Sequence, residues 1–349
     1  MTIYIGIDWS SKKHDVTMLN EQGGVIQHLV IEHSVGGFQA FDAACQKVGV
    51  TPDACIIGIE TAHSTLLDYL WLAGYEHIYV LAPGAVVANR GRSRQTGARD
   101  DRFDAFVIAD TLRTDLHRHY PWAPGSATLQ QLRVLVNRSQ FFTSEIARLS
   151  NRRQAVLIRY YPAALAVFKS WPTPINCHFV LAYPTPAAAA AISWPEFQTF
   201  AKQHHYPKPK ALLACFDRLH AAYPVARPPL VAAYQAEAQQ LATLLLATFA
   251  CAHENAHQLQ TLFVTHPDAH IFAALPGVGA WLAPALLVKL GEDRHRFPSA
   301  ASLQVIAGTA PVTEQSGKQH HVHFRRSCDH SFRNIVQQWA RCAVAQSPW

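Results

Sequence analysis

The chain has 349 residues, of which 49% are hydrophobic, so it can form two domains with separate cores and is neither disordered nor collagen-like. It holds no run of eighteen apolar residues, no basic stretch at its start and no C-x-x-C among seven scattered cysteines, so we expect a cytoplasmic protein without membrane span, secretory leader, disulfide or zinc site. A formal net charge of +6 favours a polyanionic partner.

The first predicted elements are three short strands, at residues 3–7, 16–19 and 25–31. A turn-rich segment at residues 20–24 separates the last two, and such short connections predict an antiparallel meander. The elements that follow alternate between helix and strand. They are a helix at 38–48, a strand at 54–59, a helix at 65–73, a strand at 78–81 and a helix from Pro83. This order predicts an α/β fold, a mixed sheet with helices on its faces.

Two acidic residues stand at the ends of predicted strands. Asp8 follows the first strand and Glu60 follows the fourth. The carboxyl ends of strands in α/β sheets form the edge at which ligands bind. Either residue alone could equally be an ordinary polar strand end.

Asp101 and Asp104 lie three residues apart at the start of a predicted helix, so their carboxylates share one helix face. A divalent cation such as Mg²⁺, with Mn²⁺ as a substitute, would offset their repulsion. The alternative is an acidic first turn that favours the helix dipole. Asp8, Glu60 and this acidic pair together form the arrangement of an RNase H-like nuclease, in which carboxylates hold two metal ions about 3.5–4 Å apart.

A long helical region follows residue 126. Apolar residues from Leu132 to Val156 recur at three- and four-residue spacing, which predicts a long amphipathic helix with an imperfect coiled-coil seam. Packing within one domain and a dimer seam are both open interpretations. The stretch at residues 161–229 is rich in alanine and proline and predicts short helices, and residues 230–265 predict a second long helix that returns antiparallel to the first.

The C-terminal region carries a Leu-Pro-Gly-Val-Gly turn between two predicted helices, the second at residues 280–290. Gly277 and Gly279 are typical of a helix-hairpin-helix turn that aims backbone amides at a phosphate, or of an ordinary helix cap. Ser316 is expected in a polar loop, where a serine is usually a turn residue. The cluster His320, His321 and His323 is interpreted as strand residues or phosphate contacts because no cysteine or acidic ligand lies nearby.

Basic residues accompany both the acids and the serine, as contact with a nucleic-acid backbone requires, although a solvated basic face would look the same. The candidates for this contact are Arg99, Arg102, Lys318, Arg325 and Arg326.

Five blocks, in order, resemble the transposases of insertion-sequence family 110, which are related to the Piv/MooV-type DNA invertases. The blocks are G-I-D-W-S-S-K-K-H-D-V (6–16), G-I-E-T-A-H-S (58–64), R-D-D-R-F-D-A-F-V-I-A (99–109), L-P-G-V-G (275–279) and A-G-T-A-P-V-T-E-Q-S-G-K (307–318). The chain departs from the family at residues 327–331, where members carry a Gly-Asn-containing stretch.

The resemblance implies a RuvC-like domain at residues 1–122, a helical region at 123–266 and a mainly α-helical transposase domain at 267–349. Asp8, Glu60, Asp101 and Asp104 would hold Mg²⁺, and Ser316 would attack a DNA phosphodiester and form a transient seryl-phosphate link. The family further implies donor and target DNA, a structured guide RNA (bridge RNA), a location at the bacterial nucleoid and a homo-oligomer, dimer or tetramer.

Three other functions stay open at this point. One is a RuvC-like nuclease that uses water instead of serine. Another is an actin-like ATPase, because Gly6-Ile7-Asp8 followed by Ser10-Ser11 resembles a phosphate loop, although the second glycine-rich motif of such proteins is missing. The last is a nucleic-acid-binding protein without catalytic activity.

Overall fold

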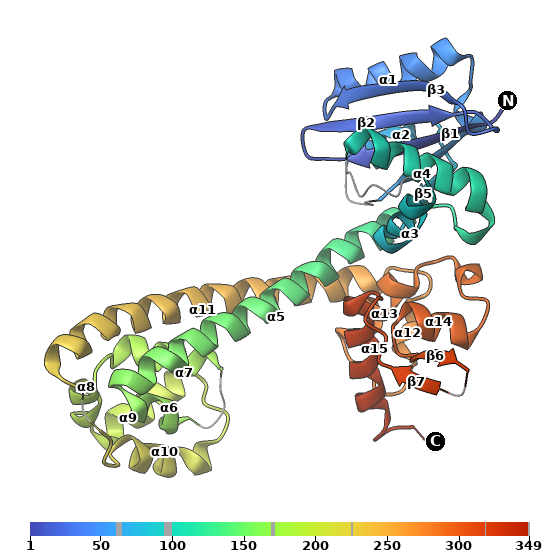
Figure 1. The fold of residues 1–349 in the computed structure, drawn as a ribbon. Helices are drawn as coiled ribbons and strands as arrows, with labels where there is room; N and C mark the ends of the chain where they lie inside the picture. Colours follow the sequence, from blue (N-terminus) through green and yellow to red (C-terminus); the bar gives the residue numbers. More distant parts are fainter. Residues whose placement is uncertain (61–64, 94–99, 169–171, 225, 318, 348–349) are drawn as a thin grey trace. The chain divides into compact units, whose positions relative to one another are not determined.

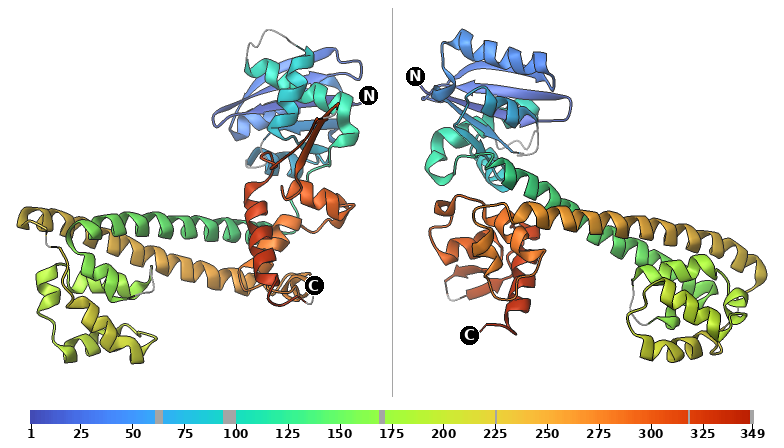
Figure 2. Two further views of the ribbon diagram at one scale, coloured as in Figure 1. Left: turned by 60° about the horizontal axis from the view of Figure 1, so that its bottom comes forward. Right: turned by 180° about the vertical axis from the view of Figure 1, so that it is seen from behind.

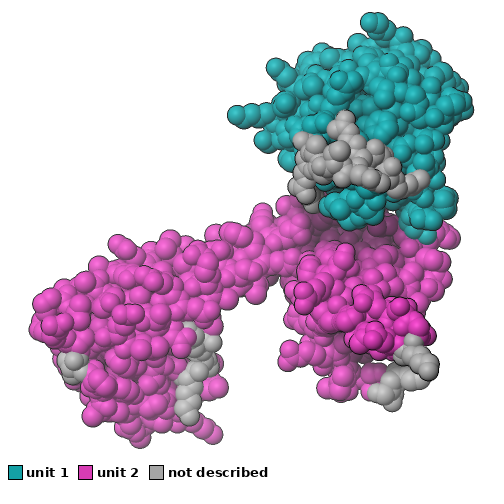
Figure 3. Space-filling model, viewed as in Figure 1, with its two compact units in different colours: residues 1–125 teal, residues 126–349 magenta. Residues whose placement is uncertain are grey.

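The computed structural model describes residues 1–60, 65–93, 100–168, 172–224, 226–317 and 319–347. The chain divides into two compact units, unit 1 at Met1–Gly125 and unit 2 at Ser126–Trp349 (Figure 3). Unit 2 therefore contains both the predicted helical region and the predicted C-terminal domain, and the division into three domains stays a prediction. No helix in the described part of the chain is both long enough and apolar enough to cross a membrane.

Unit 1 is built on a mixed sheet with the strand order β3-β2-β1-β4-β5 (Figure 1). Its strands are β1 (Ile3–Trp9), β2 (Lys13–Leu19), β3 (Val25–Glu32), β4 (Cys55–Ile59) and β5 (Ile78–Val80). The first three pair antiparallel, whereas β1, β4 and β5 pair parallel. The predicted meander and the mixed RNase H-like α/β sheet are thus confirmed.

Alternation along β1 assigns its side chains to two faces of the sheet. Ile3, Ile5 and Ile7 are fully buried on one face, where α1 (Val35–Val48) and α2 (Thr65–Leu72) cover them. Gly6 and Asp8 point to the other face, toward α4 (Asp101–Asp115).

Glycine on the second face allows α4 to lie close to the sheet. A Cβ on Gly6 would lie 1.9 Å from the carbonyl oxygen of Ala105, and a Cβ on Gly58 would lie 2.7 Å from Cγ2 of Ile108. Both glycines therefore have a steric role, and the close approach brings the first turn of α4 over the end of β1. The remaining elements of unit 1 are η1 (Pro52–Ala54), α3 (Pro83–Ser93) and η2 (Leu116–Arg118).

Two long helices, α5 (Ala127–Tyr160) and α11 (Pro228–Phe263), run antiparallel through unit 2, as Figure 2 shows from two sides. The Asn255 side chain of α11 donates to the carbonyl of Leu135 at 3.0 Å, and Arg152 of α5 donates to Glu237 at 2.8 Å. The predicted amphipathic seam is thus packed within the chain.

The segment between the long helices forms short helices around an aromatic core that includes Phe168, Phe179 and Phe197, as the alanine and proline content predicts. They are α6 (Pro162–Val167), α7 (Pro174–Ala182), α8 (Pro186–Ala190), α9 (Trp194–Gln203), η3 (Pro209–Ala211) and α10 (Leu212–Leu219).

The C-terminal part of unit 2 is mainly helical, with one two-stranded hairpin. Its elements are α12 (Ala269–Ala273), α13 (Leu282–Leu290), η4 (Arg294–Arg296), α14 (Ala300–Ile306), β6 (Val312–Ser316), β7 (Gln319–His323) and α15 (His330–Ala343). The predicted polar loop around Ser316 is wrong, because this residue ends strand β6. Helix α13 begins two residues later than the predicted start at Ala280. The three histidines of residues 320–323 are strand residues, as interpreted.

Candidate active site

Asp8 occupies the end of β1 on the face that α4 covers, and Asp15 of β2 is its partner across the antiparallel pair. Asp101 and Asp104 lie in the first turn of α4, whose start is capped by the Asp100 side chain, which accepts from the amide of Phe103 at 2.7 Å. The strand end and the capped helix start therefore bring these acids to one region of unit 1.

Burial and the charges of the other three predicted acids both act on Asp8. Burial raises the pKa of Asp8 to about 7, with further upward shifts from the carboxylates of Asp104, Asp101, Glu60 and Asp15. Burial likewise raises the pKa of Glu60, against a lowering by Arg90. Burial therefore disfavours the charged form of both carboxyl groups, and the neighbouring carboxylates add to this at Asp8.

The two carboxylate oxygens of Asp104 lie in different environments. Its Oδ2 pairs with Nη2 of Arg90 at 2.6 Å, and both side chains are mostly buried. Its Oδ1 is buried and has no hydrogen-bond partner among the described residues, and the same holds for Nε of Arg90. A buried carboxylate oxygen without a donor is costly, so this atom is the best-placed ligand for a cation from outside.

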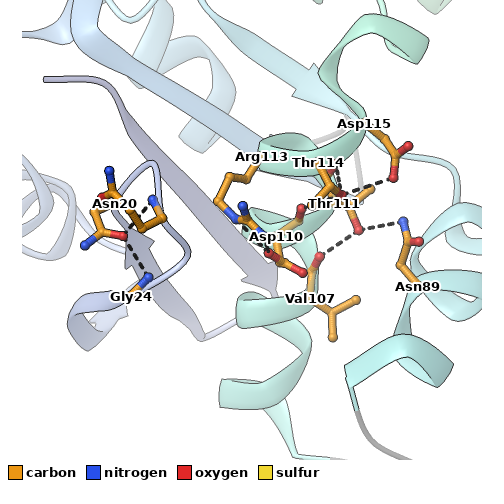
Figure 4. A network of polar contacts seen from close by, with 10 residues as sticks. Asn20, Gly24, Asn89, Val107, Asp110, Thr111, Arg113, Thr114 and Asp115 are labelled. Carbon is orange, nitrogen blue, oxygen red and sulfur yellow. Dashed lines mark hydrogen bonds and ion pairs between the residues drawn. The ribbon is translucent and has the colours of Figure 1, made fainter.

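Arg90 comes from α3, and a polar network holds that helix against α4 (Figure 4). The Asn89 amide donates to Oγ1 of Thr111 at 3.0 Å, and this hydroxyl donates to the carbonyl of Val107 at 2.7 Å. The position of Arg90 next to Asp104 is therefore fixed through its neighbour in sequence.

No group of three or more histidine, cysteine, aspartate or glutamate side chains is arranged to hold a metal ion in residues 1–60, 65–93, 100–168, 172–224, 226–317 and 319–347. The four acids are thus electrostatically coupled without meeting at one coordination point. Their donor set nevertheless suits a hard cation, because carboxylate oxygens are the ligands of Mg²⁺.

Sequence reasoning missed three residues of this site: Arg90, Asp15 and His28. Nε2 of His28 lies 3.5 Å from Oδ1 of Asp15, and its Nδ1 lies 3.1 Å from the hydroxyl of Thr17. The predicted second strand began at residue 16, whereas β2 begins at Lys13. Extending that strand by three residues and pairing it antiparallel to β1 would have placed Asp15 beside Asp8.

Ser316 stands in a contrasting environment in unit 2. It pairs with Gln319 at the turn end of the hairpin and is exposed. Among the described residues none forms a hydrogen bond with its hydroxyl. Ser316 and the acids thus belong to different units, and the described residues of unit 2 supply this serine with no activating partner.

The predicted phosphate-binding residues differ in their exposure and in their contacts. Arg102 and Arg326 are exposed, whereas Arg325 is half-buried and donates to the carbonyl of Ala310 at 3.1 Å. Arg99 and Lys318 lie outside the described residues.

The glycine turn before α13 packs against helix α15. Gly277 has a φ of +73°, and its amide donates to Oε1 of Gln346 at 2.9 Å. A Cβ on this glycine would lie 2.5 Å from the amide nitrogen of Ala343, whereas a Cβ on Gly279 would meet nothing within 4 Å. In this structure Gly277 therefore serves packing within the chain.

Comparison with known proteins decides the family. A transposase family model of the IS110 DEDD type matches residues 5–162, and a model described as the transposase IS116/IS110/IS902 family matches residues 269–349. The chain belongs to the IS110 transposase family. Asp8, Glu60, Asp101 and Asp104 lie in the first matched region of this transposase, and Ser316 lies in the second.

Individual relatives agree with this assignment. The mini-circle transposase for IS117 of Streptomyces coelicolor is 29% identical over 357 residues, which cover all of this chain and 86% of the relative. The 43.6 kDa protein of insertion element IS110 from the same organism is 29% identical over 64% of this chain and 55% of its own length. The 42 kDa protein of insertion element IS900 from Mycobacterium paratuberculosis is 27% identical over 72% of this transposase and 62% of its own length.

Proposed function

We propose that this protein cuts and rejoins DNA as the transposase of a bacterial insertion sequence, with the acids of unit 1 and Ser316 of unit 2 as its catalytic residues. The observation that carries the proposal is that Asp8, at the end of β1, lies within electrostatic reach of Glu60, Asp101 and Asp104, in a region matched to this family.

The role of the four acids is to hold Mg²⁺, or Mn²⁺ in its place. The buried Oδ1 of Asp104 has no donor among the described residues, and the pKa of Asp8 is raised first by burial and then by the neighbouring carboxylates; a bound cation would offset the charge at both. When bound, the ion supplies Lewis-acid stabilisation of the charge that develops on a phosphate during displacement at phosphorus.

Ser316 is the nucleophile of the proposed reaction. Its Oγ attacks the phosphorus of a DNA phosphodiester, the new Oγ–P bond forms and the P–O bond to the departing strand breaks. The serine hydroxyl loses its proton to solvent water, and the oxygen of the departing strand takes up a proton from water to become a free hydroxyl. Because one phosphoester replaces another, the hydroxyl of a second strand can reverse the step and complete rejoining. Exposure of the Ser316 hairpin favours its use with the acids of a second copy of the chain, so we infer a homo-oligomer, a dimer or tetramer.

Donor and target DNA and a structured guide RNA are the proposed nucleic-acid partners. The net charge of +6 supports a polyanionic partner. Arg102, Arg325 and Arg326, together with Arg99 and Lys318, are the proposed phosphate contacts. The turn at Gly277 and Gly279 would join them only after Gln346 releases the amide of Gly277.

Trapping the covalent intermediate tests this proposal. The full-length protein is incubated with guide RNA, end-labelled donor and target DNA and Mg²⁺, and the products are separated under denaturing conditions. We expect a labelled protein–DNA adduct that disappears with Ser316→Ala and with EDTA. Strand cleavage that persists undiminished in Ser316→Ala would instead establish a nuclease that uses water.

A further inference from the structure

The hairpin that carries Ser316 has almost no packing of its own. Strands β6 and β7 pair with each other alone in the described part of unit 2, and all of their residues are exposed except the half-buried Val312. An isolated two-stranded hairpin is at best marginally stable in water. The contacts that order this hairpin must therefore lie at its base, where the chain enters β6 and leaves β7.

Arg325 joins the two chain segments at that base. It follows β7 by two residues, and its Nε donates to the carbonyl of Ala310, at 3.1 Å, on the segment that leads into β6. Its Nη2 is 3.5 Å from the carbonyl oxygen of Pro311. These bonds close the base of the hairpin but attach it to nothing else.

Arg333 of α15 makes the attachment. Its Nη2 donates to the carbonyl oxygen of Arg325 and to Sγ of Cys328, and its guanidinium carbon lies 4.4 Å from the centroid of the Phe324 ring. The hairpin base is thus bound by a backbone hydrogen bond and by a cation–π contact from the same side chain.

The surroundings of Arg333 are built to accept a buried cation. The residue is 6% exposed, and no carboxylate among the described residues forms an ion pair with it. Gly308, with a φ of +68°, leaves room for the guanidinium, since a Cβ there would lie 2.7 Å from Nη2 of Arg333 and would collide with Cys328. A buried charge is costly unless its donors are satisfied. Nη2 has two acceptors, whereas the buried Nε has no hydrogen-bond partner among the described residues, so the contacts of Nη2 and of the Phe324 ring are the ones that hold the side chain in place.

Helix α15, which carries Arg333, is itself held in place by several contacts. The Asp329 side chain caps the helix by accepting from the amide of Phe332 at 3.0 Å, and it also pairs with Nζ of Lys289 on α13 at 2.8 Å. Phe332 and Ile335 are buried on either side of Arg333. The hairpin is therefore attached to the core of unit 2 through α15, whose first turn is held by the cap and the ion pair of Asp329.

We propose that Arg333 is the positioning residue for Ser316: it anchors the base of the hairpin to α15 and thereby sets where the serine at the other end stands. The catalytic consequence rests on the proposed function, while the anchoring does not. Because a misplacement of about 1 Å can slow a reaction about 10²-fold, we expect the loss of this anchor to slow adduct formation by about that factor without weakening DNA binding.

The test uses Arg333→Met in the full-length protein, with Arg333→Lys as the conservative variant and Arg341→Met, an exposed arginine on the same helix, as the matched control. Amide hydrogen exchange of residues 312–323, DNA affinity and the rate of adduct formation are measured. For Arg333→Met we expect faster exchange in the hairpin, unchanged affinity and the slower adduct rate. Arg333→Lys, which keeps a donor for the carbonyl of Arg325, should recover part of both effects, and Arg341→Met should resemble the wild type.

A second variant covers the case in which Arg333→Met does not fold. Phe324→Leu removes the ring from a side chain that is 64% exposed and leaves the backbone bond in place, so it should give the same changes at smaller size. Unchanged exchange of residues 312–323 in a folded Arg333→Met, or in Phe324→Leu if that variant alone folds, overturns the anchoring. If Ser316→Ala still cleaves DNA, the proposed function fails, but the exchange result still decides whether Arg333 anchors the hairpin.

Discussion

The acid site of unit 1 and the Ser316 hairpin of unit 2 are built in opposite ways. Asp8, Glu60 and Asp104 are half-buried and Asp101 is exposed, and Gly6 and Gly58 let α4 pack closely on the sheet. Ser316 is exposed at the end of a hairpin that, among the described residues, is attached to the rest of unit 2 at its base. The acid site is formed by close packing of a helix on a sheet, whereas Ser316 is presented by an exposed hairpin attached at its base.

The difference agrees with what each group would do in the proposed reaction. Burial raises the pKa of Asp8, and the neighbouring carboxylates raise it further, so a cation would be favoured there. In the proposed reaction Ser316 attacks a large polyanion and has to reach it, so the serine would gain from exposure and from a support that controls its position. Four predictions test this contrast.

The largest expected effect concerns the carboxylate of Asp104. Asp104→Asn should lower the rates of strand cleavage and adduct formation by about 10³-fold, because it removes charge from an oxygen that has no hydrogen-bond partner among the described residues. The measurement is the gel assay with labelled DNA and guide RNA. Asp110→Asn, on the same helix but paired with Arg113, is the control and should keep wild-type rates. Equal activity of Asp104→Asn and wild type would remove the acid site from the mechanism.

Close packing is tested at Gly6. Gly6→Ala would place a Cβ against the carbonyl oxygen of Ala105. This oxygen belongs to the backbone of α4 and, unlike a side chain, cannot move aside without shifting the helix, so unit 1 should lose about 3 kcal/mol of stability. Gly84→Ala, in α3 with open space around it, should be neutral or stabilising by up to about 1 kcal/mol. Urea unfolding followed by unit 1 tryptophan fluorescence measures both. A Gly6→Ala variant as stable as wild type would show that α4 is not pressed against β1.

The ion pair of Arg90 is the next test. Arg90→Gln should tighten Mg²⁺ binding about tenfold, equivalent to about 1.4 kcal/mol, because the guanidinium occupies Oδ2 of Asp104 and competes with the ion for its charge. Calorimetric titration with MgCl₂ measures this. Arg113→Gln removes a similarly buried ion pair from α4 and should leave the affinity unchanged. Weaker binding in Arg90→Gln would mean that Arg90 orients Asp104 for the metal instead of competing with it.

The two regions also differ in how much of their structure could be predicted from the sequence. The isoleucines of β1 alternate with Gly6 and Asp8, so burial on one face was readable and the strand was predicted. Strand β6 reads Val-Thr-Glu-Gln-Ser and is exposed on both faces, so it carries no such pattern, and a loop was expected there. Its strand pairing depends on contacts with residues 319–323 that no local signal reports.

Partners distant in sequence account for the other misses. Arg90 was visible as one of several arginines, but its pairing with Asp104 depends on how α3 packs on α4. Arg333 carries no signal in the sequence that separates it from the other arginines near it, whereas the structure buries it against the base of the hairpin. Charge patterns identify candidates for binding, and tertiary packing decides which of them are used inside the fold.

The smallest expected effect is the pH dependence that Asp8 gives to the metal-free protein. Its pKa of about 7 in the folded state lies above the value of 3.8 expected when unfolded, so the folded state binds the extra proton. The stabilisation is complete below about pH 4 and is lost as pH rises through about 7. In EDTA, Asp8→Asn should therefore melt at a higher temperature than wild type at pH 8, and the difference should shrink at pH 5.

Thermal unfolding at the two pH values, with and without Mg²⁺, checks this sign. Addition of Mg²⁺ should stabilise the wild type at pH 8, because an ion that binds the folded state alone stabilises it by mass action, and the same ion should do less for Asp8→Asn. Parallel loss of stability in wild type and Asp8→Asn between pH 5 and 8 would show that Asp8 is ionised throughout. The acid site would then lack the close coupling of charges that distinguishes it from the exposed hairpin.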